Sequence, residues 1–344
     1  NFPFHNFFCP VIPALFAGNA VVIKVSELAS WSSLKYLEIF AAALRARGHD
    51  PALVQVVTGY GETGSALVTS GVEKVFFTGS PQNGRKVMAA AAETLTPVIL
   101  ELGGKDAMIV CDDAAIEQAA STALFGVFNA CGQMCVGAER LFVFAGVYDE
   151  FVARVLAGAQ ALRQGPPLAS EVDLGAMTMT RQLEIIQALV DDAVAKGARL
   201  LCGGAPRTEL GTNFYPPTIL VDVDRSMRIM HEEHFGPVMV ITKVASEAEA
   251  IERANDCPYG LGSSVFTKDP ARARRMALVS ARKSVSSSLY HALRSADAHA
   301  ERQRRAVDRG GASEAPAPGG GRRPPRGRSR DRRARGERVR RRRA

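Results

Sequence analysis

The chain has 344 residues, of which 47% are hydrophobic, and this length is enough for two packed domains. No apolar run approaches the roughly 18 residues that a membrane span needs, and Asn1 is neither an initiator methionine nor the start of a signal peptide. We therefore expect a piece of a longer protein whose targeting region is absent. The six scattered cysteines favour a reducing compartment such as the cytoplasm.

The net charge of +8 is concentrated at one end of the chain. From Leu289 onward there are 18 arginines, no lysine and six acids, a net charge of +12, which leaves −4 for the preceding 288 residues. This end has no apolar periodicity, so we predict a disordered, basic, Arg-rich tail over residues 289–344. The same composition is expected of a GC-rich gene read out of frame.

Short β-branched runs alternate with alanine-rich stretches of helical length over the first hundred residues. Strands are predicted at 20–26, 53–59 and 74–80, with helices between them at 32–48 and 62–71. Glycine follows the helices and Ser or Thr precedes them, as at helix ends. This alternation predicts an α/β fold with a doubly wound parallel sheet.

The alternation resumes after a glycine-rich break near residue 103. A further strand is predicted within 97–110, followed by helices at 114–128, 149–162 and 181–197. We therefore expect a second α/β domain. The predicted domains are residues 1–103, residues 104–288 and the tail.

One cysteine lies in a segment suited to chemistry. The string GQMCVGAER places Cys135 after an apolar helical segment and among small residues, which leave its thiol reachable. Taken alone, a cysteine in an apolar context is more often inert packing than a nucleophile. A second string upstream, ELGGKD at residues 101–106, changes that balance.

Together these two strings resemble the paired active-site signatures of the aldehyde dehydrogenase superfamily, and the resemblance covers roughly residues 1–288. The segments NFPF, IKVSE, FFTGSPQNG, EEHFGPV and ANDCPYGLGSSVFTKD also match. IKVSELASWS and AETLTPVILELGGKDA are most similar to a branch found in plants and fungi. The resemblance implies a Rossmann-type dinucleotide-binding domain, an α/β catalytic domain, and oxidation of a small-molecule aldehyde to a carboxylate with NAD(P).

The resemblance implies three catalytic residues. Cys135 would be the nucleophile, and the tetrahedral oxyanion would be bound by the side-chain amide of Asn1 and the backbone N–H of Cys135. Loss of hydride would leave a thioester, and Glu101 would be the general base for the water that hydrolyses it. We expect the two glycines after Glu101 to let it swing between positions. Read alone, Glu101 would be a surface acid beside a glycine turn.

Two segments are predicted to bind the dinucleotide diphosphate and the adenosine. In FFTGSPQNG an apolar strand is followed by Gly79, Ser80 and Gly84, which suits diphosphate bound at a helix N-terminus. Such glycine spacing alone is weak evidence and also fits an ordinary turn. In the family, Lys24 and Glu27 point at the adenosine ribose, and a carboxylate there favours NAD over NADP.

The remaining family contacts lie on the nicotinamide side. Glu233 and Phe235 match the family's contacts to the ribose and to the ring, although Phe235 read alone would be core. We expect no metal site, because Cys131 and Cys135 show no ligand spacing with the histidines.

The chain departs from the family pattern after about Ser288, where further strands and loops are expected. A truncated, catalytically inactive relative is therefore one alternative, and we expect little or no activity from the chain as given. The intact family forms homo-oligomers, which the incomplete ribbon elements make doubtful for this chain. A nucleic-acid-binding protein acting through the tail is the other alternative, but we expect no specific nucleic acid, since the tail lacks interleaved aromatic residues.

Overall fold

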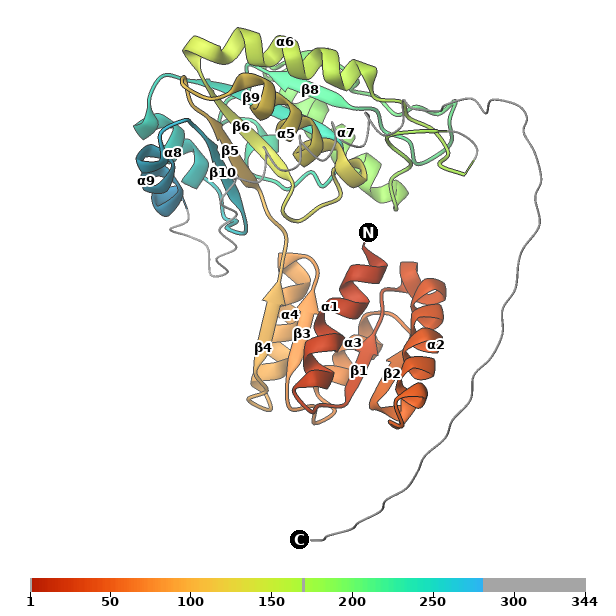
Figure 1. Ribbon diagram of the computed structural model, residues 1–344. Helices are drawn as coiled ribbons and strands as arrows, with labels where there is room; N and C mark the ends of the chain where they lie inside the picture. The colour runs from red at the N-terminus through yellow and green to blue at the C-terminus, as the bar shows by residue number, and fades with distance from the viewer. Residues whose placement is uncertain (1, 169–170, 281–344) are drawn as a thin grey trace, which may run out of the picture. The chain divides into compact units, whose positions relative to one another are not determined.

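The computed structural model describes residues 2–168 and 171–280 (Figure 1). Among these residues, no helix combines the length and the apolarity that crossing a membrane requires. The predicted tail, residues 289–344, lies outside the described residues.

The N-terminal region, residues 2–101, contains four short strands and four helices. The strands are β1 (Val21–Lys24), β2 (Val54–Val57), β3 (Val75–Thr78) and β4 (Val98–Glu101). The helices are α1 (Pro3–Phe16), α2 (Ser30–Ala46), α3 (Gly61–Val68) and α4 (Pro81–Ala92), with 3₁₀ turns η1 (Glu27–Ala29) and η2 (Pro51–Leu53). Strand β1 pairs with β2 and strand β3 with β4, both in parallel. The predicted strands and parallel pairing are present, although the ladders form two pairs rather than one continuous sheet.

The six-stranded region, residues 106–280, is built on one larger sheet. Its strands are β5 (Asp106–Val110), β6 (Ala138–Phe144), β7 (Arg199–Cys202), β8 (Thr218–Val221), β9 (Val238–Val244) and β10 (Ser263–Phe266). Its helices are α5 (Ile116–Phe128), α6 (Ala145–Ala161), α7 (Thr180–Ala195), α8 (Glu247–Asn255) and α9 (Pro270–Ser280), with 3₁₀ turns η3 (Asn129–Gly132) and η4 (Arg228–Met230). The strand order is β10-β5-β6-β9-β8-β7, and only the β7–β8 pair is antiparallel.

The main hydrophobic core lies in the six-stranded region. Strands β5 and β8 are buried along their whole length, as expected of parallel strands covered on both faces. Helices α5 and α6 pack together against β6 and β9, and α8 and α9 pack together beside β5 and β10 (Figure 1). The buried apolar cluster extends from Ala107 to Met276 and holds the strand ends in fixed positions.

Helix α1 was not predicted, and Pro10 and Pro13 lie inside it. Proline removes a backbone donor and usually breaks a helix. Here the Phe7 ring packs against Tyr36 and Phe40 of α2, with ring centroids 5.7 and 5.8 Å apart. Aromatic packing between helices therefore outweighs the local proline penalty.

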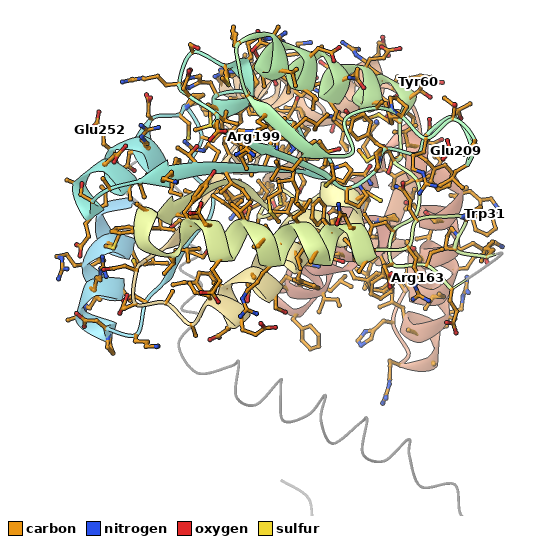
Figure 2. All side chains as sticks on the ribbon, turned by 90° about the horizontal axis from the view of Figure 1, so that it is seen from above. Trp31, Tyr60, Arg163, Arg199, Glu209 and Glu252 are labelled. Carbon is orange, nitrogen blue, oxygen red and sulfur yellow. The ribbon has the colours of Figure 1, made fainter. Side chains whose placement is uncertain are left out.

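Both regions carry exposed apolar and exposed charged side chains. In the N-terminal region, Trp31 and Tyr60 are 76% and 69% exposed, and Figure 2 shows both at the surface. The surface of the six-stranded region carries charged side chains, among them Glu209 and Glu252 (Figure 2).

Candidate active site

The predicted nucleophile, Cys135, lies in the short connection between η3 and β6 and is exposed. Three successive residues before it, Ala130, Cys131 and Gly132, have φ of 51°, 56° and 70°. Left-handed conformation at two non-glycine residues is strained, so surrounding contacts must hold this turn.

The side chain of Gln133 supplies two of those contacts. Its amide nitrogen donates to the carbonyl oxygen of Ala130 at 3.0 Å, and its amide oxygen accepts from the N–H of Thr178 at 2.9 Å. The neighbouring Cys131 is buried, and its thiol donates to the carbonyl oxygen of Gly175 at 3.2 Å. The turn therefore leaves Cys135 exposed to solvent and Cys131 buried.

The protonation of Cys135 follows from its neighbours. Partial burial and the negative charges of Asp106 and Glu233 raise the pKa of the Cys135 thiol, while the N–H groups of Val136 and Cys135 itself favour the thiolate. Burial raises the pKa of the Cys131 thiol to about 11. Cys135 therefore rests as a thiol at neutral pH.

The two glycines after the predicted base sit in close contacts. A side chain at Gly103 would collide with the Glu233 carboxylate, and one at Gly104 would collide with the Cys135 carbonyl oxygen and lie 2.8 Å from an oxygen of Asp106. Neither glycine has a positive φ. The structure therefore requires glycine at these two positions because a β-carbon has no room there. The sequence had suggested that glycine was needed for conformational freedom.

Glu101 is the last residue of β4 and is half-buried. Its backbone carbonyl accepts a hydrogen bond from Gly79 at 3.0 Å, so the predicted base lies beside the predicted diphosphate loop. Within residues 2–168 and 171–280, no hydrogen bond joins Glu101 to Cys135. Asn1, the predicted oxyanion donor, lies outside the described residues.

The predicted diphosphate segment forms the start of α4. The hydroxyl of Ser80 accepts from the N–H of Asn83 at 3.3 Å and caps the helix. Gly84 is buried, and a β-carbon there would lie 2.7 Å from the Leu102 side chain. The helix can therefore approach the chain after β4 closely only because residue 84 lacks a side chain.

Lys24 and Glu27 flank the end of β1. Lys24 is the last residue of the strand and Glu27 opens η1, and their charged groups are 3.7 Å apart. The Glu27 side chain is 48% exposed, so its carboxylate is accessible to a ligand.

The segment after η4 approaches the glycines. A carboxylate oxygen of Glu233 accepts from the N–H of Gly104 at 3.0 Å. Burial and the nearby Glu139 raise the pKa of Glu233 to about 7. Phe235 has φ of 45°, a left-handed conformation unusual for an aromatic residue.

A buried polar cluster surrounds these segments and was not predicted from the sequence. Lys105, Asp106, Glu139, Arg140 and His234 are all at most 6% exposed. The ammonium group of Lys105 is 2.7 Å from the Glu139 carboxylate. The only signal in the sequence was the presence of charged residues inside otherwise apolar strand segments.

The ionisation of the cluster depends on its pairing. Burial opposes the charge on Glu139, but His234, Lys105 and the N–H of Phe235 hold the pKa of this carboxyl below its ordinary value. Burial raises the pKa of Asp106 to about 7 and lowers that of His234 to about 4. At neutral pH His234 is therefore a neutral ring beside an ion pair.

The structure thus brings the ELGGKD, GQMC and EEHFG segments together at Gly103 and Gly104. In the described part of the chain, no group of three or more His, Cys, Asp or Glu residues is arranged to hold a metal ion. These features define an α/β protein in which three of the predicted site segments meet.

Comparison with known proteins agrees with this class. The family model described as "Aldehyde dehydrogenase family" matches residues 1–281. An aldehyde dehydrogenase-like protein of Schizosaccharomyces pombe is 41% identical over 274 residues, which are 78% of this chain and 52% of that protein. A betaine aldehyde dehydrogenase of Cereibacter sphaeroides is 43% identical over 277 residues, 80% of this chain and 56% of that protein. The chain belongs to the aldehyde dehydrogenase family, and it spans about half the length of these relatives.

Solved structures show the same fold. Lactaldehyde dehydrogenase from Escherichia coli superposes with a TM-score of 0.76 at 37% identity, over 81% of this chain and 58% of that one. PnpE in complex with nicotinamide adenine dinucleotide gives a TM-score of 0.77 at 35% identity, and an NADP-dependent Escherichia coli enzyme gives the same values; each covers 81% of this chain and 57% of its own. The predicted aldehyde dehydrogenase-like α/β fold is confirmed. The plant and fungal branch stays a prediction, since fungal and bacterial relatives are similarly close.

Proposed function

We propose that the protein oxidises an aldehyde to a carboxylic acid with NAD as the hydride acceptor. The observation that carries this proposal is the junction at Gly104, whose N–H donates to Glu233 and where an added β-carbon would collide with the Cys135 carbonyl oxygen. Two catalytic signatures and the nicotinamide-side segment therefore share one contact point.

Each reaction step has a candidate residue. The Cys135 thiol loses its proton to solvent, the resulting thiolate bonds to the aldehyde carbon, and the oxyanion is bound by the Asn1 amide and the Cys135 backbone N–H. NAD, when bound, supplies the acceptor for the hydride that leaves this carbon. The acyl group then remains on Cys135 as a thioester. Glu101 removes a proton from water, the water oxygen bonds to the acyl carbon, and the carbon–sulfur bond breaks to release the carboxylate and the thiolate.

The residues that would hold the cofactor have the chemistry that its diphosphate and its adenosine ribose require. Gly79 and Ser80 open a capped helix whose N-terminus favours a diphosphate. The accessible Glu27 carboxylate can accept hydrogen bonds from the adenosine ribose hydroxyls and repels a 2′-phosphate, which favours NAD over NADP. Glu233 and Phe235 are assigned to the nicotinamide ribose and ring. In this proposal residues 1–103 bind the cofactor and residues 104–288 carry the catalytic domain.

The test is cofactor reduction and acyl-enzyme formation with a purified version extended to the full length of the relatives, since little or no activity is expected of the 344-residue chain. NAD and a panel of aldehydes, including betaine aldehyde and lactaldehyde, should give NADH absorbance at 340 nm and an acyl adduct on Cys135 by mass spectrometry. Cys135→Ala should abolish both. Cys131→Ala is the matched control and should leave both nearly intact, because the Cys131 thiol is buried.

The base is tested separately from the nucleophile. Glu101→Gln should keep the first turnover and lower the steady rate by about 10²–10⁴, as loss of a general base typically does. NADH formation by Cys135→Ala would overturn the assignment of the nucleophile. A protein that binds NADH but forms neither NADH nor an adduct would be the inactive relative.

A further inference from the structure

Glu139 is a buried carboxylate that binds three donors. It lies in β6, four residues after Cys135. Its oxygens accept from the Lys105 ammonium at 2.7 Å, from the N–H of His234 at 3.2 Å and from the N–H of Phe235 at 2.9 Å. With 3% exposure, it has little access to water that could replace these bonds.

Two of the three donors belong to the segment that carries the nicotinamide-side residues. Phe235 adopts φ of 45°, which costs free energy for a residue with a β-carbon. The bond from its N–H to Glu139 stabilises that conformation. The preceding residue is held from the other side, because Gln182 donates to the carbonyl oxygen of His234 at 2.7 Å.

The third donor, Lys105, supplies the counter-charge. It is 1% exposed and follows Gly104, whose N–H binds Glu233. Arg140 fixes the same stretch, because its Nε donates to the Lys105 carbonyl at 3.0 Å. The segment that carries Glu233 is therefore bound to both the end of the glycine turn and the start of β6.

We propose that Glu139, with Lys105 as its buried counter-ion, is a positioning residue that holds residues 233–235 in the conformation that binds the nicotinamide half of the cofactor. This inference rests on the proposed function for the role of Glu233 and Phe235. Glu139 contacts backbone N–H groups and Lys105, so it acts through the segment it holds.

Glu139→Gln separates this role from general folding. The amide keeps the shape and one acceptor oxygen, but its NH₂ group opposes the remaining donors and leaves Lys105 without its counter-charge. We expect the Kd for NADH, followed by its fluorescence, to rise at least about tenfold. ADP-ribose lacks the nicotinamide, so its Kd should change less than about twofold.

A second measurement examines the segment without any cofactor. Amide hydrogen exchange at His234 and Phe235 should become at least about tenfold faster in Glu139→Gln, because two bonds that protect these amides are weakened. Glu209→Gln is the matched control, since Glu209 is exposed and paired with Arg207, and it should change neither exchange nor binding. The double variant Lys105→Met with Glu139→Gln removes the unpaired charge and should keep the NADH defect.

The outcomes distinguish the two proposals. Unchanged exchange at His234 and Phe235 would overturn the positioning role, as would an equal loss of NADH and ADP-ribose affinity. Restoration of NADH binding in the double variant would also overturn it, since the defect would then come from the buried charge. Wild-type protein that binds neither ligand contradicts the proposed function, while the exchange measurement still decides whether Glu139 holds the segment.

Discussion

At the scale of single residues, the reactivity of Cys135 depends on the charge of Asp106. Burial raises the pKa of the thiol and the Asp106 carboxylate raises it further, while burial raises the pKa of Asp106 itself to about 7. Asp106→Asn should therefore increase the rate at which iodoacetamide alkylates Cys135 at about pH 8, by roughly threefold or more. Near pH 6 Asp106 is mostly protonated, so the two proteins should react at similar rates.

Peptide mass spectrometry after timed alkylation measures this effect. Cys9 is an exposed thiol elsewhere in the chain and serves as the internal control. Equal rates at Cys135 for both proteins at pH 8 would mean that Asp106 does not influence the nucleophile.

Cofactor preference is the second property that we predict to depend on one residue, Glu27. Glu27→Gln removes the charge that repels a 2′-phosphate, so the ratio of the Kd values for NADPH and NADH should fall by about tenfold. Fluorescence titration of both reduced cofactors measures the ratio. Glu38→Gln is the matched control, because Glu38 is also an exposed carboxylate paired with a lysine, Lys35. If Glu27→Gln left the ratio of the two Kd values unchanged, the adenosine ribose would not bind beside Glu27.

At the scale of elements, the turn before Cys135 depends on Gly132. Its φ is 70°, and a β-carbon there would collide with the carbonyl oxygen of Gly236 and lie 2.9 Å from the nitrogen of Pro237. Gly132→Ala should therefore lower the free energy of unfolding by more than about 2 kcal/mol.

Gly146 is the matched control for that substitution. It lies in the first turn of α6, and a β-carbon added there would meet nothing within 4 Å, so Gly146→Ala should be neutral or stabilise by about 0.5–1 kcal/mol. Urea unfolding measures both variants. Similar effects at the two positions would show that the turn has no special requirement for glycine.

Most elements could be predicted because their apolar period is local. The helix predicted at 181–197 is α7, Thr180–Ala195, and the strand predicted at 53–59 contains β2, Val54–Val57. Helix α6 begins at Ala145, four residues before the predicted start at 149. Helix α1 was missed because its stability depends on α2, which no local pattern records.

The candidate site was predictable only in part for the same reason. The strings around Cys135 and Glu101 are contiguous, so they can be recognised in the sequence. The Lys105–Glu139 pair joins residues 34 positions apart, and Glu139 and His234 are 95 apart. Which charges become buried together depends on the strand order β5-β6-β9, which the alternation of helices and strands does not specify.

At the scale of the whole molecule, His234 makes stability depend on pH. Burial lowers its pKa from 6.5 to about 4, so the unfolded chain binds a proton at this residue before the folded chain does. The folded state therefore loses stability as the pH falls from about 6.5 toward 4, by about 3 kcal/mol at most. Asp106 and Glu233 act in the opposite sense, because their pKa values of about 7 favour the folded state at acid pH.

Comparison with His234→Leu isolates the histidine contribution. The difference in unfolding free energy between variant and wild type should shift in favour of the variant as the pH is lowered from about 7.5 to about 4.5, measured by urea unfolding at each pH. A difference in unfolding free energy that is constant across this range would show that the pKa of His234 is the same in the folded and unfolded states.

The strand order also has a consequence for synthesis on the ribosome. Strand β5 is the first strand of the six-stranded sheet to be made, and its neighbour β10 is the last; Asp106 and Gly262, which bind each other, are 156 residues apart. At about 5–20 residues per second, β5 waits roughly 10–30 seconds for that partner. During this interval the edge of β5 that later pairs with β10 is unpaired. The nascent chain is therefore a candidate for chaperone binding until residue 266 has emerged.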